Sequence, residues 1–212
     1  MTAARVVLLR HGRTGHNHLG VWQGQLDIPL DDVGRAQARA AAEGLARRIK
    51  RWRDAGESVR LVSSDLVRAS ETAEAVAEAA GLELDTDGRL REIYAGAWQG
   101  LTRAQIAEAG MDGDLSAWAS GVDVRVGGGE RRSEAGARTA AALLELTGEM
   151  DGGTLIAVSH GGVMRGATLT LLGLPPGSWE LVGGVANCHV VDLQTGSPHW
   201  RMLGYNVNPA AG

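Results

Sequence analysis

Several residue types and patterns are scarce in this chain, and each absence excludes a class of protein. There is no phenylalanine and only one cysteine, Cys188, so no intrachain disulfide can form. No apolar run approaches the roughly 18 residues of a membrane-spanning helix, and the N-terminal residues carry no signal-peptide pattern. The formal net charge is −4, whereas nucleic-acid-binding domains usually have a basic face. We therefore expect a cytoplasmic protein that binds neither membranes nor nucleic acid.

The composition is that of a folded protein with one core. Hydrophobic residues make up 44% of the chain and charged residues 22%, which is typical of globular domains. A chain of 212 residues buries one substantial core and is short for two ordinary domains. We expect a single domain over residues 1–212. Because the net charge is slightly negative, an anionic ligand must be bound by a local cluster of donors.

Apolar runs alternate with helical patterns along the chain. The runs with the length and β-branched character of buried strands are 5–9, 60–63, 154–158 and 187–193, with shorter extended pieces at 82–84 and 90–93. The helical patterns are 32–52, 66–80, 102–109, 115–119, 133–149 and 163–172. Residues 12–32 follow neither periodicity and are expected to form a long loop or lid. This alternation predicts an α/β fold, a three-layer sandwich with a largely parallel central sheet flanked by helices.

Two histidines follow predicted strands at the point where each strand ends. His11 comes after the strand at 5–9, and His160 comes after the strand at 154–158; a glycine follows each histidine. Ligands of open α/β sheets bind beyond the carboxyl ends of the strands, so we expect the two side chains to meet there. A glycine beside each histidine would let backbone amides approach an anion closely. For a single histidine in this position a structural role would be the more common alternative.

Two arginines are expected at the same edge of the sheet. Arg10 directly precedes His11, and Arg68 lies in the first turn of the helix that follows the strand at 60–63. Two histidines and two arginines can then converge on one small volume, which suits the binding of a phosphoryl group. The alternative is that both arginines are ordinary surface residues whose charges lie in water.

The segment Leu8-Leu-Arg-His-Gly-Arg-Thr-Gly-His-Asn17 resembles the signature of the histidine phosphatase superfamily, also called the phosphoglycerate-mutase-like family. An Arg-His-Gly triplet alone would be weak evidence. Further blocks follow in the order and spacing of the family, at 63–73, 90–92, 96–100, 128–130 and 158–162. The resemblance therefore extends over essentially the whole chain, and it implies the phosphoglycerate-mutase-like form of the α/β sandwich.

The resemblance implies three catalytic residues. His11 would be the nucleophile that attacks phosphorus and forms a phosphohistidine. Glu92 would be the general acid that protonates the leaving alcohol and later the base that activates water. His160 would stabilise the oxygens of the transferring phosphoryl group. For Glu92 the alternative is a structural salt bridge.

The resemblance also implies the residues that bind the substrate. Arg10 and Arg68 would surround the phosphoryl oxygens, with Asn17 and the backbone amide of Gly161 as further donors. Gln23 lies in a family segment that borders the substrate. Three arginines flank the glycine turn at 126–129 and are candidates for binding a second anionic group of the substrate: Arg125, Arg131 and Arg132.

A metal-independent phosphatase is the function that the resemblance implies. The sequence has no acidic cluster with metal-ligand spacing, so we expect neither a metal nor another cofactor. Arg13 stands where the mutases of the family generally carry a glutamate, and the insert that encloses the mutase intermediate is missing, so water should reach the phosphohistidine.

The expected partner is a small phosphorylated metabolite, such as glucosyl-3-phosphoglycerate or a related phosphoglycerate or sugar phosphate. The sequence leaves both a monomer and a homodimer open. Two alternatives stay open: a cofactor-dependent phosphoglycerate mutase, and a pseudoenzyme that only binds a phosphorylated ligand.

Overall fold

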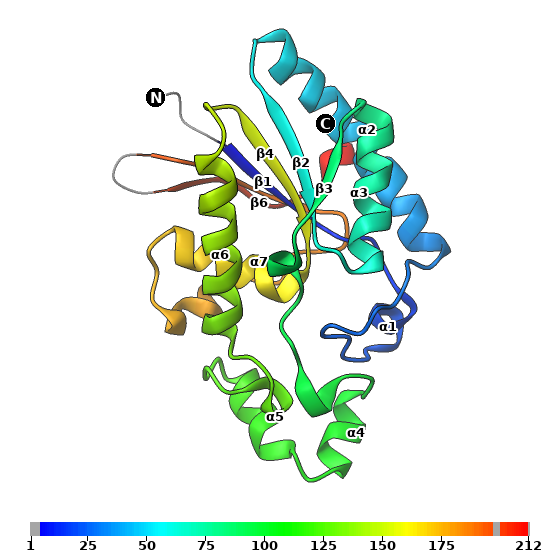
Figure 1. The fold of residues 1–212 in the computed structure, drawn as a ribbon. Helices are drawn as coiled ribbons and strands as arrows, with labels where there is room; N and C mark the ends of the chain where they lie inside the picture. Colours follow the sequence, from blue (N-terminus) through cyan, green and yellow to red (C-terminus); the bar gives the residue numbers. More distant parts are fainter. Residues whose placement is uncertain (1–4, 197–199, 212) are drawn as a thin grey trace.

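One six-stranded sheet runs through the computed structural model, which describes residues 5–196 and 200–211. The spatial order of the strands is β3-β2-β4-β1-β5-β6 (Figure 1). Their bounds are β1 (Arg5–Arg10), β2 (Val59–Ser63), β3 (Leu84–Thr86), β4 (Thr154–Ser159), β5 (Val190–Gln194) and β6 (Arg201–Val207). The first four strands pair in parallel with one another, and β5 and β6 run antiparallel to their neighbours. The carboxyl ends of the parallel strands therefore share one edge of the sheet.

Helices cover both faces of the sheet, so the predicted three-layer α/β sandwich is confirmed (Figure 1). One face is covered by α2 (Asp32–Asp54) and α3 (Val67–Ala80), the other by α6 (Arg132–Gly148) and α7 (Gly161–Leu171). Shorter helices are α1 (Gly15–Leu19), α4 (Arg103–Glu108) and α5 (Asp112–Ala119), and 3-10 turns are η1 (Gly88–Leu90), η2 (Gly96–Trp98), η3 (Val126–Gly128), η4 (Pro176–Leu181) and η5 (Pro209–Ala211). In the described ranges, no helix is both long enough and apolar enough to cross a membrane.

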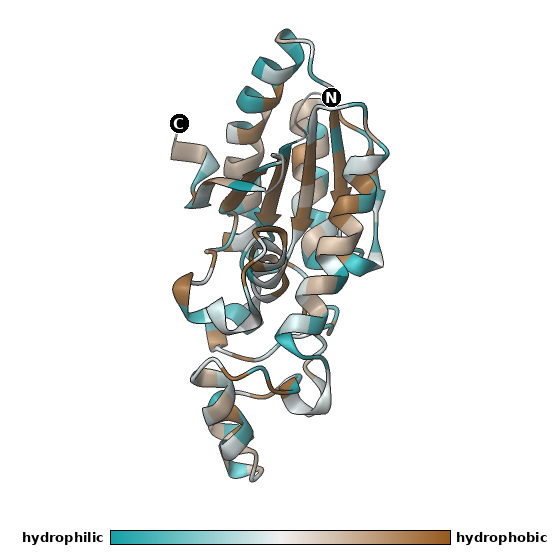
Figure 2. Cartoon of the chain, turned by 90° about the vertical axis from the view of Figure 1, so that its left-hand side faces the viewer, coloured by the Kyte–Doolittle hydropathy of each residue, from teal (hydrophilic) through white to brown (hydrophobic). Residues whose placement is uncertain are grey.

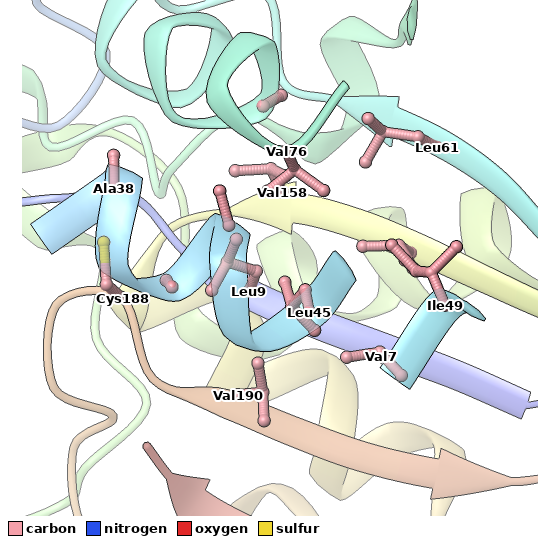
Figure 3. Close-up of a cluster of buried hydrophobic side chains, with 14 of the residues drawn as sticks. Val7, Leu9, Ala38, Leu45, Ile49, Leu61, Val76, Val158, Cys188 and Val190 are labelled. Atoms are coloured by element: carbon pink, nitrogen blue, oxygen red, sulfur yellow. The ribbon is translucent and has the colours of Figure 1, made fainter. Parts of the chain in front are cut away.

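The strands are apolar on both sides because both sides are covered. In β1, Val7 and Leu9 pack with the residues of α2 and α3, and Val6 and Leu8 pack with those of α6 and α7. Figure 3 shows side chains of α2 pointing onto β1 and its neighbours, and Figure 2 shows apolar strands between the helices. A strand in this environment has no polar alternation, which explains the continuous apolar run at 5–9.

A third apolar cluster lies apart from the sheet. Helices α4 and α5 extend beyond one end of the sandwich (Figure 1). Their buried residue Ile106 packs in a cluster of its own with Trp98, Val126, Val163 and a few smaller side chains. We call residues 93–126 with this cluster the cap. The cap faces the edge of the sheet where the parallel strands end, and the pocket described below lies between the two.

Some elements differ from the sequence prediction, for local reasons. Residues 12–32 contain α1, whose five residues are too few to show a helical period but whose capping box joins Thr14 and Asn17. The piece predicted as extended at 90–93 is the last residue of η1 and the loop that follows it. Strand β6 and turn η4 were not predicted; β6 is largely exposed and so lacks a clear apolar pattern. The glycine turn is tightly packed, because a Cβ on Gly127, at φ +56°, would lie 2.3 Å from the carbonyl oxygen of Ala95.

Candidate active site

A pocket of about 360 Å³ opens at the carboxyl ends of the parallel strands, beneath the cap. This volume lies in the range of small-molecule sites. The structure brings nearly all of the predicted site residues to it: the lining includes Arg10, His11, Asn17, Gln23, Arg68, Glu92 and Gly161. The remaining predicted residue, His160, is fully buried beside the pocket, with its ring 5.1 Å from that of His11.

The position and hydrogen bonding of His11 fix its tautomer. Its Nδ1 lies 2.6 Å from the carbonyl oxygen of Gly12. A carbonyl only accepts, so Nδ1 carries the proton and Nε2 keeps its lone pair. Burial, and next the charges of Arg10 and Arg68, hold the pKa of His11 well below its usual 6.5. The ring is therefore neutral, with a nucleophilic nitrogen available in the pocket.

His160 is engaged by protein groups on both ring nitrogens. The Nε of Arg68 donates to Nδ1 of His160 at 3.1 Å, so the proton of His160 is on Nε2, which donates to the hydroxyl of Ser64 at 2.9 Å. Burial, followed by the charge of Arg68, lowers the pKa of His160 well below 6.5. In this arrangement the ring is neutral and orients Arg68; to donate to a phosphoryl oxygen it must exchange its Ser64 partner.

Arg68 joins the sheet edge to the loop before α2. Its side chain is fully buried, and besides His160 it donates to the carbonyl oxygens of Leu26 and Gly24 at 2.7 and 2.8 Å. All of these acceptors are neutral. Burial lowers the pKa of Arg68 to about 10, which still leaves the guanidinium charged at neutral pH. The charge of Arg68 is thus fixed in place without a hydrogen-bonded carboxylate to neutralise it.

Arg10 has a free donor at the pocket. Its Nη1 donates to the carbonyl of Val185 at 2.6 Å, while its Nε is buried and has no acceptor in the described part of the chain. A buried donor without an acceptor is costly, and a phosphoryl oxygen would satisfy it. Gly161 makes room for this side chain, because a Cβ there would lie 3.2 Å from the Nε of Arg10.

Asn17 and Gln23 are oriented by their neighbours so that the amide oxygen of each is engaged. The Oδ1 of Asn17 accepts from the backbone N–H of Thr14 and from Asn187, at 3.2 and 3.3 Å. The hydroxyl of Thr14 lies 2.9 Å from the Oε1 of Gln23. With the oxygens so engaged, the NH₂ groups are the donors that remain.

Glu92 is held by backbone amides at the start of α7. Its Oε1 accepts from the N–H groups of Ile93 and Val163, both at 2.9 Å, and its Oε2 accepts from Gly162 at 3.0 Å. Oε1 therefore has both lone-pair positions filled, and Oε2 keeps one that can carry a proton. The carboxylate has no arginine or lysine ion pair among the described residues, so the salt-bridge alternative for Glu92 is not supported.

Several contributors to the site were not singled out from the sequence. Gly162 leaves room for the carboxylate of Glu92, because a Cβ there would lie 2.7 Å from its Oε1 and displace it. The side chain of Asn187 donates to the carbonyl of His11 at 2.9 Å and so helps to hold His11 in place. The sequence signal that could have pointed to Gly162 is the Gly-Gly pair that follows His160. The far wall of the pocket is built from Arg103, Trp118, Arg165 and Trp179, together with Trp22 from the family segment that also contains Gln23.

The three arginines expected to read a second anion do not line the pocket. Arg125 pairs with Glu134 at 2.7 Å, and Arg131 donates to the backbone carbonyl of Asp123. Arg132 lies between Trp118 and Trp179, as described below. Arg13 also points elsewhere, forming an ion pair with Asp31 at 2.8 Å. A second anionic group in the pocket must therefore meet other side chains.

The site offers charge from arginines instead of from a metal. Within residues 5–196 and 200–211 there is no group of three or more His, Cys, Asp or Glu side chains that could hold a metal ion. The one cysteine, Cys188, is buried, and burial raises its pKa to about 12, so it is no thiolate nucleophile. A neutral imidazole, fixed guanidiniums and a carboxyl with one open lone-pair position are the parts needed for nucleophilic phosphoryl transfer.

Comparison with known proteins identifies similar chains. Residues 6–208 match the histidine phosphatase superfamily (branch 1). The chain is 39% identical over 208 residues to a glucosyl-3-phosphoglycerate phosphatase of Mycobacterium tuberculosis (strain CDC 1551 / Oshkosh), covering 94% of this chain and 88% of the relative. A mycobacterial glucosyl-3-phosphoglycerate phosphatase solved with VO3 has a TM-score of 0.87 at 37% identity, covering 97% and 100% of the two chains. A phosphoserine phosphatase from Entamoeba histolytica solved with 3-phosphoglyceric acid has a TM-score of 0.81 at 27% identity, covering 98% of each chain.

Proposed function

This chain belongs to the histidine phosphatase superfamily (branch 1) and is a phosphatase, and from that premise we propose that it hydrolyses a small phosphorylated metabolite through a phosphohistidine at His11. One observation carries the proposal. The Nδ1–H of His11 is fixed on the carbonyl of Gly12, which leaves Nε2 free in a pocket with unneutralised arginines. This is the arrangement that in-line attack on a phosphoryl group requires.

The proposed reaction has two steps. Nε2 of His11 attacks phosphorus, the bond from phosphorus to the leaving oxygen breaks, and that oxygen takes the proton from Oε2 of Glu92. Water then attacks the phosphohistidine, Glu92 takes a proton from the water, and the bond from phosphorus to Nε2 breaks to release phosphate. Arg10 and Arg68 stabilise the charge on the phosphoryl oxygens in both steps, with Asn17 and Gly161 as further donors. His160 holds Arg68 in place through its Nδ1.

For the substrate we propose glucosyl-3-phosphoglycerate or a related phosphoglycerate or sugar phosphate. Relatives named for that activity support it, with similarity over nearly the whole chain. A screen of phosphorylated metabolites for released phosphate, without added metal, tests it. Steady phosphate release supports hydrolysis. Transfer of the phosphoryl group between positions of a phosphoglycerate, without phosphate release, would instead establish the mutase alternative, and binding without either reaction would establish the pseudoenzyme.

A change at His11 tests the phosphoenzyme. The His11→Ala variant should lose turnover by several orders of magnitude and take up no phosphate, because no other group in the pocket replaces the imidazole. The wild type should give an acid-labile phosphoprotein when mixed with labelled substrate and quenched rapidly. Circular dichroism of the variant checks that it is folded. Retained turnover in His11→Ala would end the mechanism.

We also propose that the protein works in the cytoplasm, as one domain, either alone or as a homodimer. The composition and the lack of a disulfide-forming pair of cysteines support the compartment. Light scattering of the purified protein distinguishes monomer from dimer, and cell fractionation tests the compartment.

A further inference from the structure

Beyond the phosphoryl end, arginines and tryptophans alternate in a stack, of which Arg103, Trp118, Trp179 and Arg165 line the pocket while Arg132 lies behind them. The guanidinium of Arg103 lies 5.6 Å from the ring of Trp118, and Arg132 lies 4.2 Å from the same ring. On its other side, Arg132 is 4.5 Å from the ring of Trp179, and Arg165 is 4.2 Å from that ring. We call these five residues the ladder. Each cation lies over an aromatic face, which fixes it without a carboxylate.

The pocket contains more positive charge than its own acid can neutralise. Four arginines line it, two at the phosphoryl end and two in the ladder, against the single acid Glu92. The carboxylate of Glu92 is bound by three backbone amides. Within the described ranges, none of the four arginines forms an ion pair, although arginines elsewhere, such as Arg125 and Arg138, do. One dianionic phosphoryl group balances the arginines at one end. Glu180, which lies outside the lining, acts on Arg165 through its charge without forming an ion pair, and burial still lowers the pKa of Arg165.

Arg165 shares with Arg10 the feature that marks the phosphoryl position. Both line the pocket, both donate through one terminal nitrogen to a backbone carbonyl, and both have a buried Nε that lacks an acceptor in the described chain. The indole N–H of Trp118 is likewise buried without an acceptor there. Buried donors without acceptors are costly in the free protein, and a bound anion would satisfy them.

The middle of the ladder supports the same conclusion. Arg132 is 5% exposed, and its Nε and Nη1 lack acceptors among the described residues. Burial, and next the charge of Arg165, lower the pKa of Arg132 to about 10. Two cations that repel each other across Trp179 are stabilised when an anion binds beside one of them.

The position of Arg165 on α7 sets the distance between the two anions. Gly161 and Gly162, which face the phosphoryl end and Glu92, are the first residues of α7, and Arg165 follows three to four residues later. Residues so spaced lie on one helix face, about 4.5–6 Å apart along the axis. A separation of this order suits the phosphoryl group and the carboxylate of a three-carbon phosphoglycerate.

We propose that Arg165, supported by Arg103, forms a second anion subsite that binds a carboxylate of the substrate and sets the preference for phosphorylated acids over phosphorylated alcohols. The subsite rests on the proposed phosphatase function, since it acts on the same substrate. The ladder tryptophans hold the two guanidiniums flat, and Arg132 positions both rings from behind.

A matched pair of substrates tests the subsite. 3-Phosphoglycerate and glycerol 3-phosphate differ only in the carboxylate at the far end. In Arg165→Gln, kcat/KM for 3-phosphoglycerate should fall about 10-fold to 100-fold, mainly through KM, because a charge-assisted hydrogen bond is lost. The value for glycerol 3-phosphate should change less than about 3-fold. Arg165→Lys should recover part of the preference, and Arg131→Gln, outside the pocket, should leave it unchanged.

A second variant, Arg103→Gln, tests the subsite if Arg165→Gln does not fold well. Arg103 is exposed, and its loss should reduce the same preference several-fold without affecting folding. Equal kcat/KM losses on both substrates, or no change in their ratio, would overturn the subsite.

Binding separates this proposal from the phosphatase function. With His11→Ala as the background, which cannot turn over, calorimetry gives the dissociation constants of 3-phosphoglycerate with and without Arg165→Gln. A wild type that hydrolyses neither compound, together with binding that weakens about 10-fold or more in the double variant, would refute the hydrolysis and keep the subsite. Hydrolysis by the wild type with binding unaffected by Arg165→Gln would refute the subsite and keep the hydrolysis.

Discussion

Replacing Glu92 by glutamine separates a proton donor from a structural carboxylate. If Oε2 gives its proton to the leaving oxygen, the variant should lose about 10²-fold to 10⁴-fold in kcat/KM on an alkyl phosphate. p-Nitrophenyl phosphate has a leaving group that needs little protonation, so its kcat/KM should fall far less. The quantity to measure is the ratio of the two kcat/KM values, which should drop by at least about 10²-fold.

The structure also gives the cost of this substitution to stability. Oε1 accepts two backbone N–H groups and Oε2 accepts one, so in either orientation the amide NH₂ of glutamine faces an N–H donor. One buried donor left without an acceptor costs about 1–3 kcal/mol. For a chain of this size that lowers the melting temperature by roughly 2–12 °C. A loss of folded protein lowers the apparent kcat/KM on both substrates by the same factor, so it leaves the ratio of the two values unchanged.

A matched control is Glu130→Gln. The Glu130 carboxylate also accepts a backbone N–H, from Tyr94 at 2.8 Å, and it pairs with Arg138, but it does not line the pocket. Its substitution should lower the melting temperature and leave the substrate ratio as in the wild type. If Glu92→Gln loses activity equally on the alkyl and aryl phosphates, the general-acid role is refuted.

Two further predictions concern metal and pH. Activity should survive EDTA, because arginines carry the charge stabilisation; loss in EDTA with recovery on adding a divalent ion would contradict this. In the folded chain, His11 and His160 have pKa values well below 6.5. Below about pH 6.5 the unfolded chain therefore binds protons that the folded chain does not. The free energy of unfolding should fall as the pH drops, by up to about 1.4 kcal/mol per pH unit for each histidine. Urea unfolding at about pH 7.5 and 5.5 measures this, and equal stability at both would rule out buried neutral rings.

The strand and helix pattern and the phosphoryl end of the site could be predicted from the sequence because local rules govern them. The apolar run at 5–9 and the histidine after it follow from a strand covered on both faces, and Arg68 follows from a helix start at the same edge. Contacts between distant segments could not be found this way. No local pattern brings Arg165 against Trp179, or Trp118 and Trp179 to the two sides of Arg132. The prediction instead took the arginines near the glycine turn, because they are close to it in sequence.

The tautomers show a second limit of sequence reasoning. The sequence indicates that His11 and His160 meet, but their different roles depend on single acceptors, the carbonyl of Gly12 for one and Arg68 with Ser64 for the other. In the free protein, His11 lines the pocket as expected. His160 instead has both ring nitrogens engaged, by Arg68 and Ser64.

The separate packing of the cap has a consequence for how substrate range can diverge. The apolar cluster around Trp98 and Ile106 is distinct from the two clusters that cover the sheet. Free-energy changes at sites without shared partners are nearly additive. Ile93 and Val163 belong to this cluster and also hold Glu92 through their backbone N–H groups, so exchanges at those two positions reach the site. At the other cap positions, side chains can be exchanged while His11, Arg10 and Arg68 keep their own partners, so in this architecture selection for a new metabolite can act mainly on the cap.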